Sequence, residues 1–236
     1  MYIHWLQHVE FEGLGCIQAW AREHGHNVRA TRFWAGDSLP EPGAMDMLVV
    51  MGGPMGVYDE SAYSWLAAEK RFIRAVAKRT TPVLGICLGA QLLASVCGAR
   101  ITVNPNKEIG WFEVSPSAEL PPWAAGIFTR QMVMFHWHGD TFELPPTALP
   151  FGTSVACRNQ GFIIDDHVVG LQFHPEMTMA GVNALIEQCG NELADGPWIQ
   201  TAEQMRDGEG FITAAHEFMG RLLDYLQQRA NFSRSP

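Results

Sequence analysis

The sequence predicts an α/β fold with a mainly parallel sheet. Short apolar runs rich in β-branched residues alternate with helical patterns through roughly the first hundred residues, which is typical of βαβ units. After residue 110 the pattern changes to short strands and turns, so we expect additional antiparallel strands in the second half. At 236 residues and 47% hydrophobic composition, the chain can bury one sizeable core, and we expect one domain spanning residues 1–236.

The first half supplies the parallel strands and their helices. The expected strands are 2–8, 27–33, 45–51 and 81–86, with a helix over 16–23. Ser61 is a plausible N-cap for a long helix that runs to about Arg79, with Lys and Arg side chains near its end. Within this helix Trp65, Phe72 and Val76 recur at helical spacing.

The second half supplies shorter elements. The expected strands are 111–114, 131–135, 161–164 and 168–173, and the expected helices are 178–189 and 211–228. In the last helix Phe218, Leu222 and Leu226 step by four along one face, which indicates packing. We interpret residues 107–111 as a structural turn, and residues 190–210 are polar and irregular.

Composition excludes several classes of function. The five cysteines are odd in number and contain no CxxC pair, so neither a disulfide framework nor a thiolate zinc site is indicated. The net charge is -9 and the sequence contains no run of basic residues, which argues against a nucleic-acid-binding surface. No stretch reaches the roughly 20 apolar residues needed to cross a bilayer, and the N-terminus lacks a signal-peptide profile. We therefore expect a cytoplasmic protein that binds neither membranes nor nucleic acid.

Cys87 is the candidate nucleophile. Gly85-Ile86-Cys87-Leu88-Gly89 follows an apolar strand and precedes a helix, and it fits the G-x-nucleophile-x-G elbow with Cys in place of Ser. The tight turn forces a strained backbone at its centre, and the flanking glycines avoid collisions. A helix N-terminus also favours the thiolate. We interpret the other four cysteines as buried apolar side chains.

His174 and Glu176 are the candidate partners of Cys87. His174 ends the apolar strand before Pro175, so it should lie at the sheet edge where open α/β folds place ligands. A histidine has the pKa that shuttling a proton to a leaving amine requires. Glu176, two residues on, can accept the other imidazole N–H and fix the ring as the third member of a triad does.

Together these residues resemble the class I, or triad-type, glutamine amidotransferases, in particular stand-alone members similar to the amidotransferase domain of GMP synthase. The resemblance is nearly full length and implies a flavodoxin-like three-layer α/β/α sandwich. It rests on five ordered blocks, which are Met51-Gly52-Gly53-Pro54-Met55-Gly56, Gly85-Ile86-Cys87-Leu88-Gly89-Ala90-Gln91, Lys107-Glu108-Ile109-Gly110-Trp111, His136-Trp137-His138-Gly139-Asp140 and Gln172-Phe173-His174-Pro175-Glu176.

The resemblance implies a role for each catalytic residue. Cys87 would attack the side-chain amide of glutamine and form a γ-glutamyl thioester. His174 would protonate the departing ammonia and then activate water, while Glu176 would hold His174. The backbone N–H groups of Gly53 and Leu88 would form an oxyanion hole, where losing one donor typically costs roughly 10²–10³ in rate.

The resemblance also implies a set of substrate contacts and no cofactor. Gln91 would touch bound glutamine through its amide, and Trp137, His138 and Gly139 would lie beside the glutamine backbone atoms. His136, His138 and Asp140 could instead be metal ligands, because alternate residues of an extended segment share a face. A nucleophilic thiolate needs no metal, so we prefer hydrogen-bonding roles and expect no metal.

Three functions are weighed at this point. The first is a glutamine amidohydrolase, free-standing or serving a separate ammonia-accepting synthase subunit, because we expect no synthase domain within this chain. The second is a γ-glutamyl peptide hydrolase with the same triad, for which Met55 in the oxyanion loop, where many relatives carry a smaller residue, would alter the pocket. The third is a non-catalytic regulatory or binding subunit, which the complete set of Cys87, His174 and Glu176 disfavours.

Overall fold

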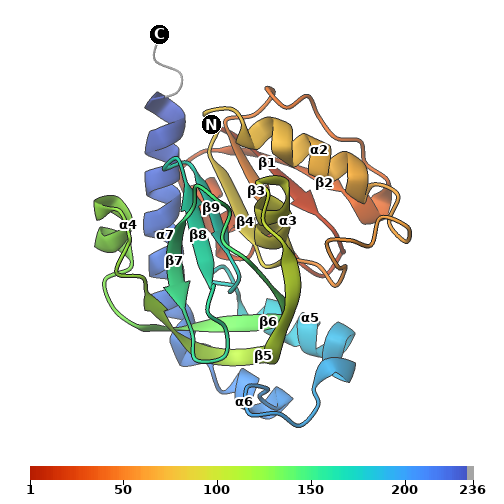
Figure 1. The fold of residues 1–236 in the computed structure, drawn as a ribbon, viewed down its shortest axis with the longest axis vertical. Helices are drawn as coiled ribbons and strands as arrows, with labels where there is room; N and C mark the ends of the chain where they lie inside the picture. Colours follow the sequence, from red (N-terminus) through yellow and green to blue (C-terminus); the bar gives the residue numbers. More distant parts are fainter. Residues whose placement is uncertain (233–236) are drawn as a thin grey trace.

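A computed structural model describes residues 1–232, and these residues form a nine-stranded sheet flanked by helices (Figure 1). The strands are β1 (Tyr2–Gln7), β2 (Asn27–Arg32), β3 (Met47–Val50), β4 (Val83–Ile86), β5 (Ile101–Pro116), β6 (Met132–Phe142), β7 (Leu149–Thr153), β8 (Gly161–Ile164) and β9 (Val168–Leu171). The α-helices are α1 (Cys16–Glu23), α2 (Leu66–Ala77), α3 (Leu88–Val96), α4 (Pro122–Ile127), α5 (Met179–Cys189), α6 (Ala202–Arg206) and α7 (Glu209–Phe232). Short 3₁₀ turns are η1 (Phe33–Ala35) and η2 (Gly190–Glu192).

The sheet has a parallel half and an antiparallel half. Its order is β2-β1-β3-β4-β9-β8-β7-β5-β6, and the first five strands are mutually parallel. The order β2-β1-β3-β4 followed by a fifth parallel strand is that of flavodoxin-like folds. Here the fifth place is taken by β9, which comes back from late in the chain. The predicted α/β class with additional antiparallel strands is therefore confirmed.

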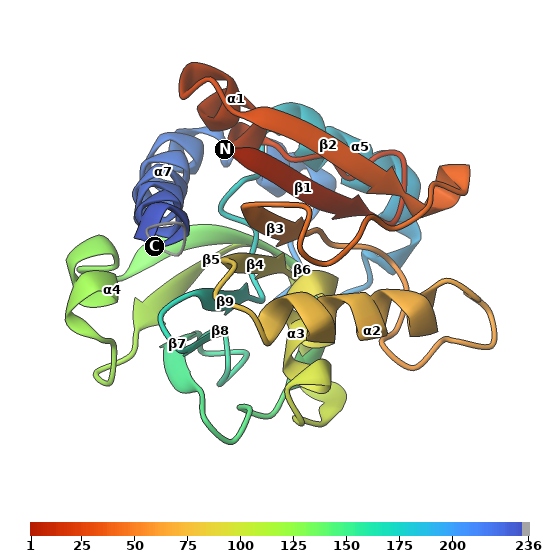
Figure 2. The same ribbon diagram turned by 90° about the horizontal axis from the view of Figure 1, so that it is seen from above.

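Helices cover both faces of the parallel half, as the view from above shows (Figure 2). The alternation of side chains along β3 divides the core between these faces, because successive strand residues point to opposite sides. Met47 and Val49 pack with α1 and α7, whereas Leu48 and Val50 pack with α2 and α3. This two-sided burial explains why the parallel strands are continuous apolar runs.

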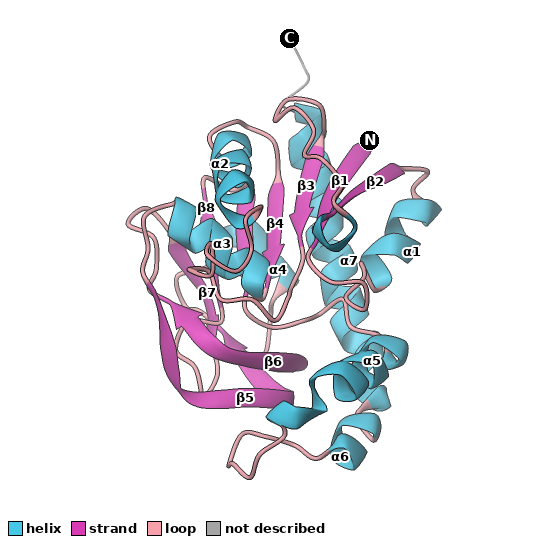
Figure 3. Cartoon of the chain, turned by 90° about the vertical axis from the view of Figure 1, so that its right-hand side faces the viewer, coloured by secondary structure: helices cyan, strands magenta, loops and turns pink. Residues whose placement is uncertain are grey.

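The long pair β5–β6 lies across the carboxyl edge of the parallel strands and carries α5 and α6 beside it (Figure 3). Its own apolar cluster includes Ile109, Trp111 and Phe135, which pack with Val182 of α5 and Met205 of α6. This pair therefore forms a wall at the carboxyl edge of the sheet, where the βα loops of the parallel strands begin.

Several sequence expectations about individual elements were wrong. Residues 107–111 are not a turn but the middle of β5, and residues 108–111 pair with β6 directly after a register shift between Val103 and Glu108. The long helix begins at Leu66 with no side-chain cap, so Ser61 is not its N-cap. Residues 61–65 instead form turns that place Trp65 in a stack on Phe33.

Other differences concern the ends and number of elements. Phe33 leaves the predicted second strand for a 3₁₀ turn, and the polar segment 190–210 contains α6 with a capping box at Thr201. Helix α4 and strand β7 were not among the predicted elements. Among residues 1–232, no helix combines the length and apolar character needed to span a membrane.

Helix α3 packs so closely on β3 that one glycine is essential. A Cβ atom at Gly89 would overlap the carbonyl group of Val50, which is backbone and cannot move aside cheaply. Gly89→Ala is expected to lower the free energy of unfolding by about 3 kcal/mol, measured by denaturant titration. Gly220→Ala in α7, where a Cβ meets nothing within 4 Å, should instead raise it by about 1 kcal/mol. Equal effects of the two substitutions would contradict this account.

Candidate active site

Cys87 occupies a strained turn between β4 and α3. Its backbone has φ 51° and ψ -108°, a conformation that non-glycine residues rarely adopt. The turn is fixed on both sides, because the Cys87 N–H donates to the carbonyl of Leu171 at 2.8 Å and its carbonyl accepts from Gln91 N–H at 3.1 Å. The side chain thus stands at the carboxyl edge of the sheet and at the N-terminus of α3.

His174 and Glu176 lie just beyond the end of β9. The Nδ1 atom of His174 is 2.8 Å from Oε1 of Glu176, and both side chains are buried. The backbone of this segment is also tied down: His174 N–H donates to Phe135 at 2.8 Å, and Cys16 N–H donates to the Glu176 carbonyl at 2.9 Å. Because Nδ1 is engaged by Glu176, Nε2 is the ring nitrogen available to a nucleophile.

The electrostatics of His174 favour its protonated form. Burial by itself lowers the pKa of His174, but the Glu176 carboxylate, the nearby Cys87 and the hydrogen bond to Glu176 raise it well above the ordinary value. The ring of His174 lines the same pocket as the sulfur of Cys87, and the structure brings together all three residues predicted to act in catalysis. The arrangement can stabilise a thiolate beside an imidazolium ion.

Sequence reasoning assigned no role to Gln172, although it contacts the sulfur. Its Nε2 donates to Cys87 Sγ at 3.6 Å, its Oε1 accepts from Gln91 at 3.1 Å, and the residue is fully buried. The signal was present, because Gln172 and His174 are two residues apart on an extended segment and so share a face. A second neighbour of the sulfur is the carbonyl of Trp137, also at 3.6 Å.

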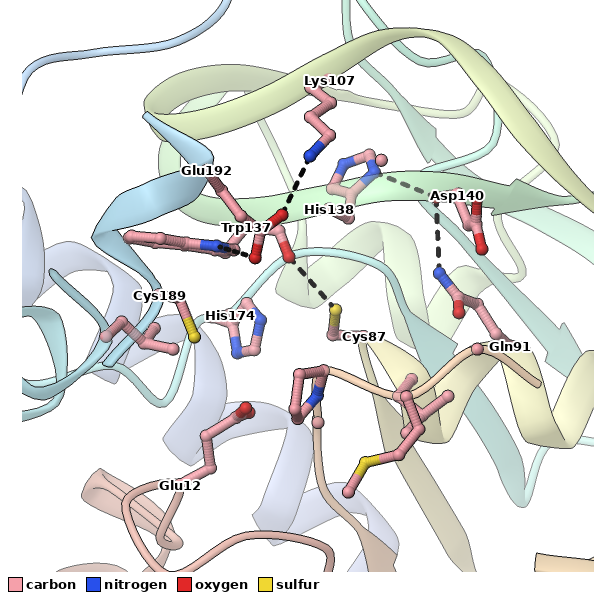
Figure 4. Close-up of a pocket in the computed structure, with 17 residues that line it drawn as sticks. Glu12, Cys87, Gln91, Lys107, Trp137, His138, Asp140, His174, Cys189 and Glu192 are labelled. Carbon is pink, nitrogen blue, oxygen red and sulfur yellow. Dashed lines mark hydrogen bonds and ion pairs between the residues drawn. The ribbon is translucent and has the colours of Figure 1, made fainter. Parts of the chain in front are cut away.

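A pocket of about 230 Å³ opens above the sulfur of Cys87. The six residues predicted to contact substrate all line it: Gly53, Leu88, Gln91, Trp137, His138 and Gly139. They come from the loop after β3, from α3 and from β6, and Figure 4 shows Gln91, Trp137 and His138 around Cys87 and His174. The side-chain amide nitrogen of Gln91 already donates hydrogen bonds to the Asp140 carbonyl and to Gln172 Oε1, so the amide oxygen of Gln91 is the atom left for a ligand.

The pocket is also acidic, which the sequence did not reveal. Glu12, Asp140 and Glu192 line it together with one cation, Lys107, which is paired with Glu192 at 3.0 Å. Removal of Glu12 from bulk water raises its pKa, although the nearby ring of His174 acts in the opposite direction. The missed residue Glu12 follows β1, and only the parallel pairing of β1 with β3 brings that loop to this edge.

The Glu12 carboxylate lies on the His174 side of the pocket. A Cβ atom at Gly52 would overlap this carboxylate and would stand 3.2 Å from Cε1 of His174. The absence of a side chain at Gly52 therefore leaves room for both groups. In Figure 4 the Glu12 side chain points up toward His174, on the opposite side of the pocket from His138.

The histidines of β6 do not form the metal-ligand set that the sequence offered as an alternative. His136 and His138 are joined by Glu108 of β5, and only the backbone carbonyl of Asp140 contacts His138. Burial lowers the pKa of His136 to about 4, despite the adjacent Glu108 carboxylate. The set His136, His138 and Asp140 is therefore not the one that the fold assembles.

The match to known proteins is extensive. The model of the glutamine amidotransferase class-I family matches residues 18–189. The chain belongs to this family. The glutamine amidotransferase-like protein YfeJ of Salmonella typhimurium is 34% identical over 235 residues, which cover 96% of this chain and 97% of that protein.

Other family members differ in length. The crystal structure of a glutamine amido transferase from Methylobacillus flagellatus superposes with a TM-score of 0.90 at 29% identity, covering 96% of this chain and 94% of that one. GMP synthase of Thermomicrobium roseum is 34% identical over 146 residues, which cover 59% of this chain but only 25% of the synthase. The similarity thus extends over 96% of this chain in the first two proteins and over 59% of it in the synthase.

Glu176 should control the charge of His174. Replacing Glu176 by Gln removes the carboxylate that raises the pKa of the ring, so the His174 pKa is expected to fall toward or below 6.5. Titration of the histidine ring signals by NMR measures this directly. Glu217→Gln on the exposed side of α7 is the matched control. An unchanged His174 pKa in the Glu176 variant would contradict the assigned pairing.

Proposed function

We propose that the chain is a glutamine amidohydrolase that releases ammonia from the side-chain amide of glutamine through a γ-glutamyl thioester on Cys87. The observation that carries the proposal is the buried contact of His174 Nδ1 with Glu176 at 2.8 Å, with His174 and Cys87 lining the same pocket. Membership of the class I family supports amidohydrolase chemistry that depends on a cysteine. The pocket supplies space for a γ-glutamyl group directly above the sulfur.

In the first half-reaction the thiolate of Cys87 attacks the amide carbon, and the carbonyl oxygen becomes an oxyanion. The N–H groups of Gly53 and Leu88 are proposed to receive it, since both residues line the pocket and Leu88 begins a helix whose first N–H groups lack helical partners. The imidazolium of His174 gives its proton to the departing nitrogen. The carbon–nitrogen bond then breaks, leaving the thioester and free ammonia.

In the second half-reaction His174, now neutral, takes a proton from water, and the resulting hydroxide attacks the thioester carbon. A second oxyanion forms at the same place and collapses, expelling the Cys87 thiolate and leaving glutamate. Glu176 keeps the ring in the tautomer with a proton on Nδ1 throughout. Gln91, Trp137, His138 and Gly139 are proposed to hold the glutamine backbone atoms.

The acidic side of the pocket favours glutamine over γ-glutamyl peptides. The leaving nitrogen must approach His174, which is also the side where the Glu12 carboxylate lies. The leaving amino acid of a γ-glutamyl peptide carries a carboxylate one carbon from that nitrogen, and Glu12 in its ionised form, which the His174 imidazolium favours, would repel it. Ammonia has no such group, so we place γ-glutamyl peptide hydrolysis second.

Ammonia released in this way can pass to an acceptor. The proteins named GMP synthase that match this chain carry the matching segment as about a quarter of a longer chain. This supports a separate ammonia-accepting synthase subunit as the partner, although a free-standing glutaminase would use the same site.

The nucleophile is tested by Cys87→Ser. We expect ammonia release from glutamine to fall by at least about 10⁴-fold, because a nucleophile and its base act as one unit. The measurements are ammonia, glutamate and the mass of the trapped acyl-enzyme. Cys97→Ser, which changes a partly buried cysteine outside the pocket, should keep wild-type rates. Equal activity in the Cys87 and wild-type proteins would refute the mechanism.

The role of Glu12 is tested by comparing leaving groups. Wild type should prefer glutamine and γ-glutamyl ethylamide to γ-glutamylglycine. In Glu12→Gln the ratio of kcat/KM for γ-glutamyl ethylamide to kcat/KM for γ-glutamylglycine should fall by about tenfold. The reason is that removing a nearby charge is worth about 1–2 kcal/mol here. Glu187→Gln on the exposed side of α5 is the matched control. If the Glu12 variant is active and this ratio does not change, Glu12 does not discriminate between the leaving groups.

A further inference from the structure

Three buried side chains meet between β5 and β6, beside the catalytic pocket. Glu108 Oε2 is 3.2 Å from His138 Nε2 and 3.5 Å from His136 Nδ1. Their side chains are at most 1% exposed, and one ligand atom from each residue lies within 4.8 Å of the others. The pairing of β5 with β6 produces this meeting, because Glu108 lies directly opposite His138 in the ladder.

These contacts differ from the other buried histidine–carboxylate pairs of the molecule. His8 with Glu69 and His174 with Glu176 both close to 2.8 Å as hydrogen bonds. In the Glu108 cluster the two nitrogen–oxygen distances are 3.2 and 3.5 Å, and neither contact has the geometry of a good hydrogen bond. Within residues 1–232, the ring nitrogens of His136, Nε2 of His138 and Oε1 of Glu108 have no hydrogen-bond partner. Leaving so many buried polar atoms unpaired is costly unless something binds them together.

The tautomer of His138 sharpens the point. Its Nδ1 is 3.1 Å from the carbonyl oxygen of Asp140, which can only accept, so Nδ1 carries a hydrogen. In the neutral ring Nε2 is then an acceptor, and it faces a carboxylate oxygen at 3.2 Å. Two lone pairs at this separation repel each other. A cation between them removes the repulsion.

We propose that Glu108, His136 and His138 bind a divalent cation of the zinc type. Two imidazole nitrogens and one carboxylate oxygen form a donor set that zinc uses, with bonds of about 2.0–2.1 Å. Two ligands on one tetrahedral ion then lie roughly 3.3–3.4 Å apart, which is close to the 3.2 and 3.5 Å found here. The third pair, the two imidazole nitrogens, lies within 4.8 Å, so the rings would move closer together to share one ion.

The surroundings fit such an ion. Gln160 Nε2 donates to Glu108 Oε2 at 2.6 Å, and the Ser154 hydroxyl donates to the same oxygen at 3.1 Å. Hydrogen bonds of this kind orient a ligating carboxylate and are regular companions of metal sites. Glu108 also borders a second cavity of about 250 Å³ beside Trp111 and Trp198, which gives an approach from outside.

The ion would act on the catalytic pocket through His138. That residue lines the pocket above Cys87, so a cation on its Nε2 fixes the orientation of the ring while its Nδ1 holds the Asp140 carbonyl. The cation touches neither the substrate nor the sulfur and is therefore a positioning element. Binding does not depend on the proposed glutaminase activity, because no ligand belongs to the Cys87–His174–Glu176 set.

Zinc binding is measured on chelator-treated protein carrying Cys87→Ser, so that the reactive thiol cannot bind the metal. Calorimetry with Zn²⁺ should give one site per chain, and His136→Asn in the same background should weaken binding at least tenfold. His24→Gln, an exposed residue directly after α1, is the control and should bind as tightly as its parent. No binding, or binding unaffected by His136→Asn, would overturn the proposal.

A spectroscopic measurement keeps the test valid if the His136 variant does not fold. Co²⁺ added to the Cys87→Ser protein should give tetrahedral d–d absorption bands without a thiolate charge-transfer band. Bands that appear only in the wild-type protein, with a thiolate charge-transfer feature, would place the metal on Cys87 and refute the site. The NMR signals of His138 give a second check. If Nε2 carries a proton and its signal does not change on addition of Zn²⁺, a proton and not a metal ion joins His138 to Glu108, and the proposed site is refuted.

Discussion

The parallel pairing of β4 with β9 is the constraint on which the rest of the site depends. Residues 87 and 174 are far apart in sequence, yet each follows the carboxyl end of one of these neighbouring strands. The ladder continues one step past β4, where the Cys87 N–H donates to Leu171 at 2.8 Å. The backbone that holds the strained cysteine is therefore the same backbone that delivers His174.

The strain at Cys87 is sustained by the packing around it. A positive φ in a residue with a side chain costs of order 1–3 kcal/mol and persists only where its surroundings leave no alternative. Helix α3 is held against β3 by the close approach of Gly89 to Val50, and β4 is buried on both faces. The turn between them cannot relax without separating the helix from the sheet. The sulfur consequently stays at the edge, next to the ring of His174.

The β5–β6 pair completes the site by adding polar groups to an edge that α/β strands alone would leave open. It supplies Trp137, His138 and Gly139 to the pocket and carries the Glu108 cluster behind them. Burying this many titratable groups is costly unless each charge has a partner. His174 meets that requirement through Glu176, at a nitrogen–oxygen distance of 2.8 Å. The corresponding distance from His138 to Glu108 is longer, at 3.2 Å, and this difference distinguishes the two clusters.

The sequence by itself determined the α/β class, the elbow at Cys87 and the identity of His174 and Glu176 as its candidate partners. These features are local: a strand, a tight turn and a helix dictate where glycine and a nucleophile can stand. Only the tertiary structure decided that Glu12, Gln172 and Glu108 join them. Their positions depend on which distant strands pair and in what register, and those choices follow from packing across the whole sheet and not from neighbouring residues.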